Sequence, residues 1–406
     1  MSRPEVRTLS GRDELQALAV TQGHAFGIFR SDDDVEERAE LLAHVTCRGA
    51  FVDGRMVGTA VDWTPRLSLP GGPQLTTVAL SMIGVLPTHR RRGVMRELLD
   101  AQIAGAREQG IAVAALTASE ATIYGRFGFG QSTVQLGAVE VDTVHGAFVA
   151  GRADGGTVRL LELDEALAVL PAVHERSLPV MPGDLSRVPE AWAYDLSPKR
   201  SQRRFIAVHE PAGGGPADGY AIYSLERRWQ DNVSGHLVET EDMVWATPEA
   251  HAGLWRYLLD IDLVSTVRAI DRPLDDPIRL LLRDNRRARM GPLQDIMWLR
   301  LLDPAAALAG RGYFADGDVV LEVHDVDGGS RRLELTVSAG RAGCEPTGAP
   351  PGVELAEQTL AAAFLGGYRV SHLHRAGLVE ELRPGAAERL DALLQGEREP
   401  WCSAGF

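Results

Sequence analysis

Hydrophobic positions in the first third of the chain follow the periods of strands and helices. An apolar stretch at residues 78–85 predicts a strand. From Val94 to Ala106, apolar residues recur every three or four positions, which predicts an amphipathic helix. A short unbroken apolar run at residues 111–116 is typical of a strand buried on both faces. The pattern therefore predicts a strand, a helix and a buried strand in succession.

A basic loop joins the first strand to the helix, where the sequence reads Arg90-Arg91-Arg92-Gly93. The first turn of a helix has unpaired N–H groups and the positive end of the helix dipole, so it attracts phosphate. Arginine adds forked donors, and Gly93, which has no Cβ, lets a ligand approach the backbone. The loop predicts a pyrophosphate site, although a basic helix start can equally bind RNA or be solvated. Neither common glycine-rich nucleotide loop occurs here.

A second, shorter helix is predicted after the buried strand. Residues 117–120 read Thr-Ala-Ser-Glu, which fits a capping box at a helix start. The helix carries Tyr124. A tyrosine in this position commonly packs in the core with its hydroxyl hydrogen-bonded, so core packing is the alternative to any chemical role.

This order of elements resembles the GCN5-related N-acetyltransferases (GNAT), whose pyrophosphate loop reads arginine/glutamine-x-x-glycine-x-glycine/alanine. Arg90 and Gly93 match the first and fourth positions, and Met95 departs at the sixth, where a small residue is usual. The segments 87–93, 114–120 and 123–130 resemble signatures of the Eis (enhanced intracellular survival) subfamily. The resemblance is strong over residues 77–133, and the whole chain is consistent with it in length and layout.

The resemblance implies acetyl-coenzyme A (acetyl-CoA) as co-substrate. It places the pantetheine against the strand end and the pyrophosphate on the loop and helix start. The implied coenzyme residues are Ile83, Gly84, Val85, Arg90, Arg91, Arg92, Gly93, Val94, Met95, Arg96, Ser119 and Glu120. For Ser119 and Glu120, capping of the following helix is a sufficient alternative role.

The resemblance also implies two catalytic groups. Tyr124 would protonate the leaving thiolate, since a tyrosine of pKa about 10 keeps its proton at neutral pH. The α-carboxylate of Phe406 would be the general base, with Trp401 and Phe406 anchoring the tail by burial. Acids at residues 32–37 are the next candidates. They fall within a helical region, residues 23–45, that is expected to form a wall of a substrate cleft or a solvated face.

A short internal sequence repeat predicts a second copy of the fold. Residues 253–260 repeat the pattern of residues 93–100 after a strand and a proline, but without the arginines, so we expect a degenerate coenzyme site there. The predicted fold class is α+β, with tandem GNAT folds (mixed central sheets with flanking helices) followed by a sterol-carrier-protein-like α/β domain. The expected domains are residues 1–145, 146–303 and 304–406.

Composition narrows the expected partners. The chain of 406 residues carries a net charge of −14, which disfavours nucleic acid and favours cationic ligands. No apolar segment is long enough to span a bilayer, and the N-terminus does not read as a signal peptide. Three scattered cysteines fit the cytoplasm, and the 11 histidines form no metal motif, so no metal is expected.

Three functions remain open at this stage. The leading one is acetylation of amino groups on cationic small molecules, with aminoglycoside antibiotics the class that the resemblance suggests. The second is acetylation of lysines in peptides or proteins. The third, a non-enzymatic lipid carrier built on the last domain, would have no need of the basic loop. The resemblance further implies a homohexamer.

Overall fold

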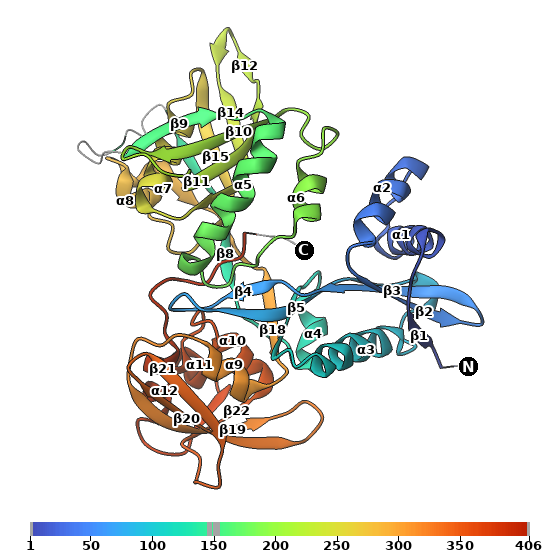
Figure 1. Ribbon diagram of the computed structural model, residues 1–406. Helices are drawn as coiled ribbons and strands as arrows, with labels where there is room; N and C mark the ends of the chain where they lie inside the picture. The colour runs from blue at the N-terminus through green and yellow to red at the C-terminus, as the bar shows by residue number, and fades with distance from the viewer. Residues whose placement is uncertain (1–2, 144–147, 149–154, 404–406) are drawn as a thin grey trace.

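Two helix-covered sheets and a smaller third sheet make up the fold (Figure 1). The computed structural model describes residues 3–143, 148 and 155–403. Among these residues, no helix has both the length and the apolar character needed to cross a bilayer.

The first sheet has the strand order β1-β2-β3-β5-β6-β18-β7, and β4 pairs with β5. Helices α1 and α2 cover one face, and α3 covers the other. The strands are β1 Glu5–Thr8, β2 Thr46–Val52, β3 Arg55–Trp63, β4 Arg66–Ser68, β5 Gln74–Val85, β6 Val113–Thr117, β7 Gly130–Gln131 and β18 Met297–Leu301. The helices are α1 Arg12–Phe26, α2 Asp32–Leu42, α3 Val94–Glu108 and α4 Ala121–Tyr124. The predicted strand, helix and buried strand are confirmed as β5, α3 and β6.

The parallel strands β5 and β6 separate along their length. They pair from Thr77 to Leu80 on β5, and beyond Leu80 the β6 side of β5 has no strand partner among the described residues. The cause is local: Met82 has a φ of +52°, and the register with β3 shifts at this point. Such an irregularity bends a strand. The bend leaves the β6 side of residues 81–85 without a strand partner in the described part of the chain, so a ligand can approach the backbone there.

The second sheet repeats this plan in the order β16-β8-β15-β14-β11-β10-β9, with α5 and α6 on one face and α7 on the other. Strand β17 pairs with β8, and β12 and β13 form a separate hairpin. The strands are β8 Val134–Asp142, β9 Gly156–Leu160, β10 Arg204–Pro211, β11 Gly219–Glu226, β12 Trp229–Gln230, β13 Val233–Ser234, β14 His236–Trp245, β15 Val264–Pro273, β16 Ala288–Met290 and β17 Leu293–Asp295. The helices are α5 Leu163–Ser177, α6 Pro189–Asp195, α7 Pro248–Leu259 and α8 Ile278–Leu281.

One strand from each half lies in the other half's sheet. Strand β8 precedes the expected boundary at residue 145 yet pairs with β15 in the second sheet. Strand β18 precedes the boundary at residue 303 yet pairs with β6 in the first sheet. The expected limits therefore do not separate the two sheets. The period of a strand shows which residues face a core but not which sheet the strand joins.

The third sheet has the order β21-β20-β19-β22-β23. Its elements are α9 Pro304–Gly310, β19 Gly317–His324, β20 Ser330–Ser338, β21 Arg341–Pro346, β22 Val353–Ala356, α10 Glu357–Ala363, α11 Val370–Arg375, β23 Val379–Glu381 and α12 Ala386–Leu394. The predicted hairpin around the turn at residues 327–329 is confirmed as β19 and β20. The core of this unit continues into the first sheet, where Arg300 of β18 forms a buried ion pair with Glu357 of α10.

Candidate active site

A cavity of about 810 Å³ lies where β5 and β6 separate. The C-terminal end of α1, the end of β5, the start of α3 and the segment around α4 enclose it. It brings together all of the predicted coenzyme residues except Arg92. Its lining is Ala25, Phe26, Ile83, Gly84, Val85, His89, Arg90, Arg91, Gly93, Val94, Met95, Arg96, Ser119, Glu120, Thr122, Ile123, Tyr124, Arg126 and Phe127.

The loop before α3 has the backbone form of an anion-binding turn. Arg91 and Gly93 have φ angles of +62° and +79°, and Gly93 is the N-cap of α3. Glycine adopts this conformation without strain. No side chain caps the helix start, so its first N–H groups face the cavity unpaired. The donors and the positive helix end together suit a pyrophosphate.

The arginines of the loop are not equivalent. Arg90 donates to the carbonyls of Ala25 (3.2 Å) and Val85 (3.5 Å), so it also holds the end of α1 against β5. Arg91 lines the cavity, whereas Arg92 is exposed and does not. The positive φ at Arg91 separates the two neighbours, and the predicted coenzyme contact of Arg92 stays a prediction.

Sequence reasoning missed Arg126, which lines the same cavity from the segment after α4. The guanidinium groups of Arg96 and Arg126 lie 5.1 Å and 5.6 Å from the centroid of the Phe127 ring. Contact with the ring holds both cations in the lining of the cavity. The sequence feature that could have indicated Arg126 is its position within the segment 123–130, which resembles a subfamily signature.

The predicted capping box before α4 is wrong. The N-cap is Glu120, and no side chain bonds the helix start. Thr117 instead ends β6, and its buried hydroxyl has no partner among the described residues. Ser119 and Glu120 line the coenzyme cavity, so their predicted place near the ligand remains open to test.

Tyr124 ends α4 with its ring buried and 8% of its surface exposed. The ring packs edge-on against Phe129, with 6.1 Å between centroids. Burial, and after it the charge of Glu120, raises the pKa of the hydroxyl above its ordinary value, so it is protonated at neutral pH. Among the described residues the hydroxyl has no hydrogen-bond partner, and it is not among the fully buried polar atoms, so it is available to a ligand or to solvent.

Tyr124 also lines a second, smaller hollow of about 210 Å³. This acceptor hollow, as we call it, shares Phe26, Ile83, Ser119 and Tyr124 with the coenzyme cavity. Its remaining lining residues are Gln22, Arg38, Leu80, Ser81, Met82 and Thr117. Tyr124 is therefore at the junction of two spaces, one of which extends along the basic loop.

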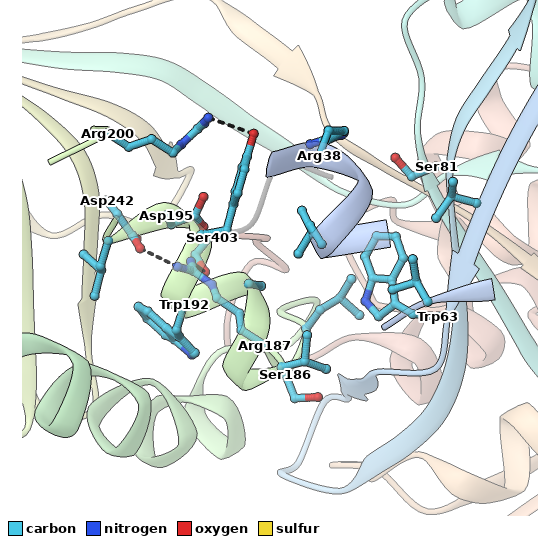
Figure 2. Close-up of a pocket in the computed structure, with 18 of the residues that line it drawn as sticks. Arg38, Trp63, Ser81, Ser186, Arg187, Trp192, Asp195, Arg200, Asp242 and Ser403 are labelled. Atoms are coloured by element: carbon cyan, nitrogen blue, oxygen red, sulfur yellow. Dashed lines mark hydrogen bonds and ion pairs between the residues drawn. The ribbon is translucent and has the colours of Figure 1, made fainter. Parts of the chain in front are cut away.

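A third space of about 560 Å³ lies between the two GNAT-like units (Figure 2). It shares Arg38, Ser81 and Met82 with the acceptor hollow, so the two are continuous. The predicted wall from residues 23–45 is present, because α2 lines this space with Arg38, Leu41 and Leu42. The opposite wall comes from α6, β11 and β14 of the second unit.

The charges on this interdomain cavity do not favour cations. Four arginines line it, against the carboxylates of Asp195, Glu241 and Asp242. Asp242 pairs with Arg187 at 2.7 Å, and Glu241 pairs with Arg204. Asp195 is the carboxylate in this lining whose side chain makes no hydrogen bond or ion pair to the described residues. The chain as a whole is negatively charged, but the lining of this cavity is not.

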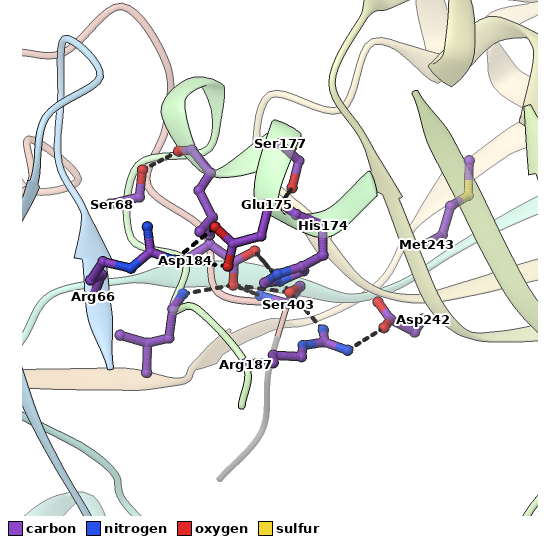
Figure 3. A network of polar contacts seen from close by, with 12 residues as sticks. Arg66, Ser68, His174, Glu175, Ser177, Asp184, Arg187, Asp242, Met243 and Ser403 are labelled. Carbon is purple, nitrogen blue, oxygen red and sulfur yellow. Dashed lines mark hydrogen bonds and ion pairs between the residues drawn. The ribbon is translucent and has the colours of Figure 1, made fainter. Parts of the chain in front are cut away.

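The C-terminal segment reaches the wall of the interdomain cavity at Ser403 (Figure 3). The backbone N–H of Ser403 and its hydroxyl donate to Asp184 at 3.0 and 2.9 Å, and Arg187 donates to the hydroxyl at 2.8 Å. Trp401 is buried, as the sequence predicted for it. The predicted base, the α-carboxylate of Phe406, lies outside the described residues.

The alternative bases at residues 32–37 point elsewhere. Asp34 and Glu37 pair with Lys199 at 2.5 and 3.2 Å, and Glu36 pairs with Arg12. None of these acids lines the acceptor hollow or the interdomain cavity. The described residues also contain no group of three or more histidine, cysteine or acidic side chains placed to hold a metal.

Comparisons with known proteins agree with this geometry. Two family models described as acetyltransferase (GNAT) domain match residues 5–132 and 183–301, and a sterol carrier protein domain model matches residues 304–403. The N-acetyltransferase Eis of Mycobacterium tuberculosis is 35% identical over 361 residues, which cover 86% of this chain and 85% of that protein. The chain belongs to the Eis family of GNAT N-acetyltransferases.

Two further relatives extend the match over the full length of this Eis-family enzyme. A Streptomyces avermitilis protein described as an uncharacterized N-acetyltransferase is 34% identical, with complete coverage of both chains. The crystal structure of Eis1 from Mycobacterium abscessus superposes with a TM-score of 0.87 at 30% identity, and covers 99% of this chain and 100% of that one. The tandem arrangement and the third domain are therefore family features.

The second cleft of this Eis-family enzyme is filled by its own side chains. Strands β14 and β15 separate after Thr240, as β5 and β6 do after Leu80. Arg272 donates to the carbonyl of Met243 at 2.8 Å, on the backbone that would otherwise face a pantetheine. The start of α7 is also closed, because the side chain of Thr247 accepts from Ala250 N at 3.1 Å.

We therefore expect one coenzyme site per chain of the Eis-family enzyme. Isothermal titration of the whole protein with acetyl-CoA or coenzyme A should give a stoichiometry of one, because the second cleft offers neither a free strand edge nor an uncapped helix. A stoichiometry of two would show that Arg272 moves out of the cleft, and would contradict the degenerate-site prediction.

Proposed function

We propose that this enzyme transfers the acetyl group of acetyl-CoA to an amine bound in the acceptor hollow and the adjoining interdomain cavity. The observation that supports the proposal most is the position of Tyr124, which lines both the coenzyme cavity and the acceptor hollow. A group at this junction can reach the sulfur of the thioester and the attacking amine alike. The proposed coenzyme contacts are the end of β5, the loop and the start of α3.

The chemistry requires three things of these residues. The neutral amine nitrogen attacks the thioester carbonyl, a C–N bond forms, and the C–S bond breaks. Backbone groups at the free edge of β5 would donate to the carbonyl oxygen as it gains charge. Tyr124 would share its proton with the departing thiolate, whose conjugate acid has a pKa near 8.5. The transfer is uphill, so partial proton donation describes the step best.

A base must take the proton released by the amine. We retain the α-carboxylate of Phe406 in this role, supported by the family resemblance and by the position of Ser403 on the cavity wall. Asp195 is a second candidate, because its carboxylate lines the same cavity without a bonded partner. The variant Asp195→Asn distinguishes the two candidates. If it acetylates the amine at the native rate, Asp195 is not the base, and the α-carboxylate of Phe406 remains the candidate.

The acceptor class rests on the family more than on the site. Aminoglycosides are the class that the resemblance suggests, and lysine side chains of peptides are the alternative. Release of coenzyme A thiol from acetyl-CoA should be measured with kanamycin, with a lysine peptide and with no acceptor. Thiol release that requires an amine supports the proposal, and release that is equal with and without amines contradicts it. Assembly into a hexamer is a family-based proposal of the same kind.

A pair of neighbouring arginines tests the coenzyme site. Arg91→Ala removes a cation from the cavity lining, and a charge-assisted hydrogen bond is worth about 1.5–3 kcal/mol. We expect the KM for acetyl-CoA to rise about tenfold or more, with kcat changed less. Arg92→Ala is the matched control, because Arg92 is outside the lining, and its KM should change less than about threefold. A larger rise in KM for Arg92→Ala than for Arg91→Ala would place the phosphate on the Arg92 side of the loop.

A further inference from the structure

Arg38 holds an unpaired positive charge at the acceptor hollow. It is on α2 and lines both the hollow and the interdomain cavity. Its guanidinium donates to the sulfur of Met82 at 3.2 Å, and its buried Nε has no partner among the described residues. No described carboxylate lies within ion-pair distance of it. A half-buried guanidinium in this state has donors to spare for an anion.

A second cation strengthens the positive field beside the hollow. Arg30 donates to Gln22 of the hollow at 2.6 Å, and its own buried Nε also has no partner among the described residues. Burial, and after it the nearby charge of Arg38, lowers the pKa of Arg30, although the charge of Asp34 acts in the opposite direction. The nearest acids, Asp34 and Glu37, pair with Lys199 instead, so an anionic ligand would add a counter-charge that the two guanidinium groups lack.

The acceptor hollow contains no opposing charge. Of the described residues that line it, Arg38 is the charged one, and the others are neutral at pH 7. A polycation would therefore meet repulsion at the point where its amine must react. The same charge helps a reacting amine, because a nearby cation favours the neutral, nucleophilic form. The site thus suits an acceptor that carries an anion next to its amine.

We propose that Arg38 binds the carboxylate of an amino-acid-like acceptor whose amine reacts beside Tyr124; the inference rests on the proposed acetyl transfer. A guanidinium fork matches a carboxylate in a bidentate manner. Arg38 and Tyr124 line the same hollow of about 210 Å³, so the inference calls for an acceptor whose carboxylate is close to its amine. The remainder of the acceptor extends into the interdomain cavity, against Leu41, Trp63 and Val188.

A matched pair of acceptors tests this inference. Leucinamide has a neutral amide where leucine has its carboxylate. For each acceptor, kcat/KM of the variant is divided by that of the parent, so the different basicities of the two amines cancel. For Arg38→Gln, kcat/KM with leucine should fall at least tenfold, while kcat/KM with leucinamide falls less than threefold. Arg38→Lys keeps the charge but lacks the forked donors. Its kcat/KM with leucine should lie between those of the parent and Arg38→Gln. Arg107→Gln, at an exposed arginine on the last turn of α3, should change neither.

The outcomes separate the inference from the proposed function. An equal loss of kcat/KM with leucine and leucinamide would overturn the inference, because Arg38 would then act on the reaction in general. No loss with either acceptor would also overturn it, because Arg38 would then have no role in acceptor binding. Thiol release with kanamycin but not with any of a panel of amino acids would also overturn it, and leave the proposed function standing. No amine-dependent thiol release with any acceptor would overturn the proposed function itself. An unchanged KM for acetyl-CoA in Arg38→Gln confirms that the variant is folded.

Discussion

Tyr124→Phe is expected to lower kcat by about 100-fold or more, the size of a lost general acid. The substitution keeps the ring, and with it the edge-on contact with Phe129, and removes only the hydroxyl. The KM for acetyl-CoA should barely change, because that ligand is held by β5, the loop and α3. The measurement is steady-state thiol release under saturating acetyl-CoA and acceptor.

Tyr368→Phe is the matched control for this substitution. Tyr368 is a half-buried tyrosine of the third unit and lines neither the coenzyme cavity nor the acceptor hollow. Its variant should retain native kcat and native thermal stability. If Tyr124→Phe behaves in the same way, Tyr124 is a packing residue, and the proton must reach the thiolate from solvent or from another group.

Asp276→Ala is expected to destabilise the second unit by roughly 3–5 kcal/mol, the cost of breaking a buried ion pair. Both carboxylate oxygens are used: His251 Nε2 and Ile278 N lie 2.9 and 3.0 Å from one, and Arg272 Nε lies 3.2 Å from the other. Asp276 and Arg272 are buried beside Trp245 and Trp401. Urea unfolding followed by tryptophan fluorescence reports on this unit.

The effect should depend on pH. Burial acts to raise the pKa of Asp276, but the neighbouring His251 and Arg272 outweigh it and hold the pKa below its ordinary value. The contribution is therefore full above the unfolded pKa of about 3.9 and is lost as the pH falls below it. Glu239→Ala, which breaks an exposed pair with Arg268, should cost about 1 kcal/mol or less. Equal losses for the two variants would contradict the expectation.

The local elements were predictable because each is encoded by a short stretch of sequence. The apolar period predicts α3 and β6, and the repeated pattern at residues 253–260 falls in α7 and its C-cap. The coenzyme cavity follows from the same stretch, since strand, loop and helix are consecutive. The position of Arg92 outside the cavity lining was not predictable, because a loop sequence does not reveal the φ angle of +62° at Arg91.

The acceptor side was not predictable from the sequence, because it is assembled from distant segments. Arg38 lies in a helix whose other charges pair with Lys199 and Arg12 at the surface, and nothing in the sequence distinguishes it from them. Asp195 is contributed by the second unit and meets Arg38 only across the interdomain cavity. The membership of β8 and β18 in their sheets is likewise a long-range property.

The exchange of β8 and β18 has a consequence during synthesis on the ribosome. Strand β6 leaves the ribosome about 180 residues before β18, the strand that pairs with it. At roughly 5–20 residues per second, the edge of β6 stays open for roughly 9–36 s. An open, fully apolar strand edge is a template for aggregation. We therefore expect β6 to need temporary cover until the second half of the chain is made, and neither half is expected to be soluble when expressed alone.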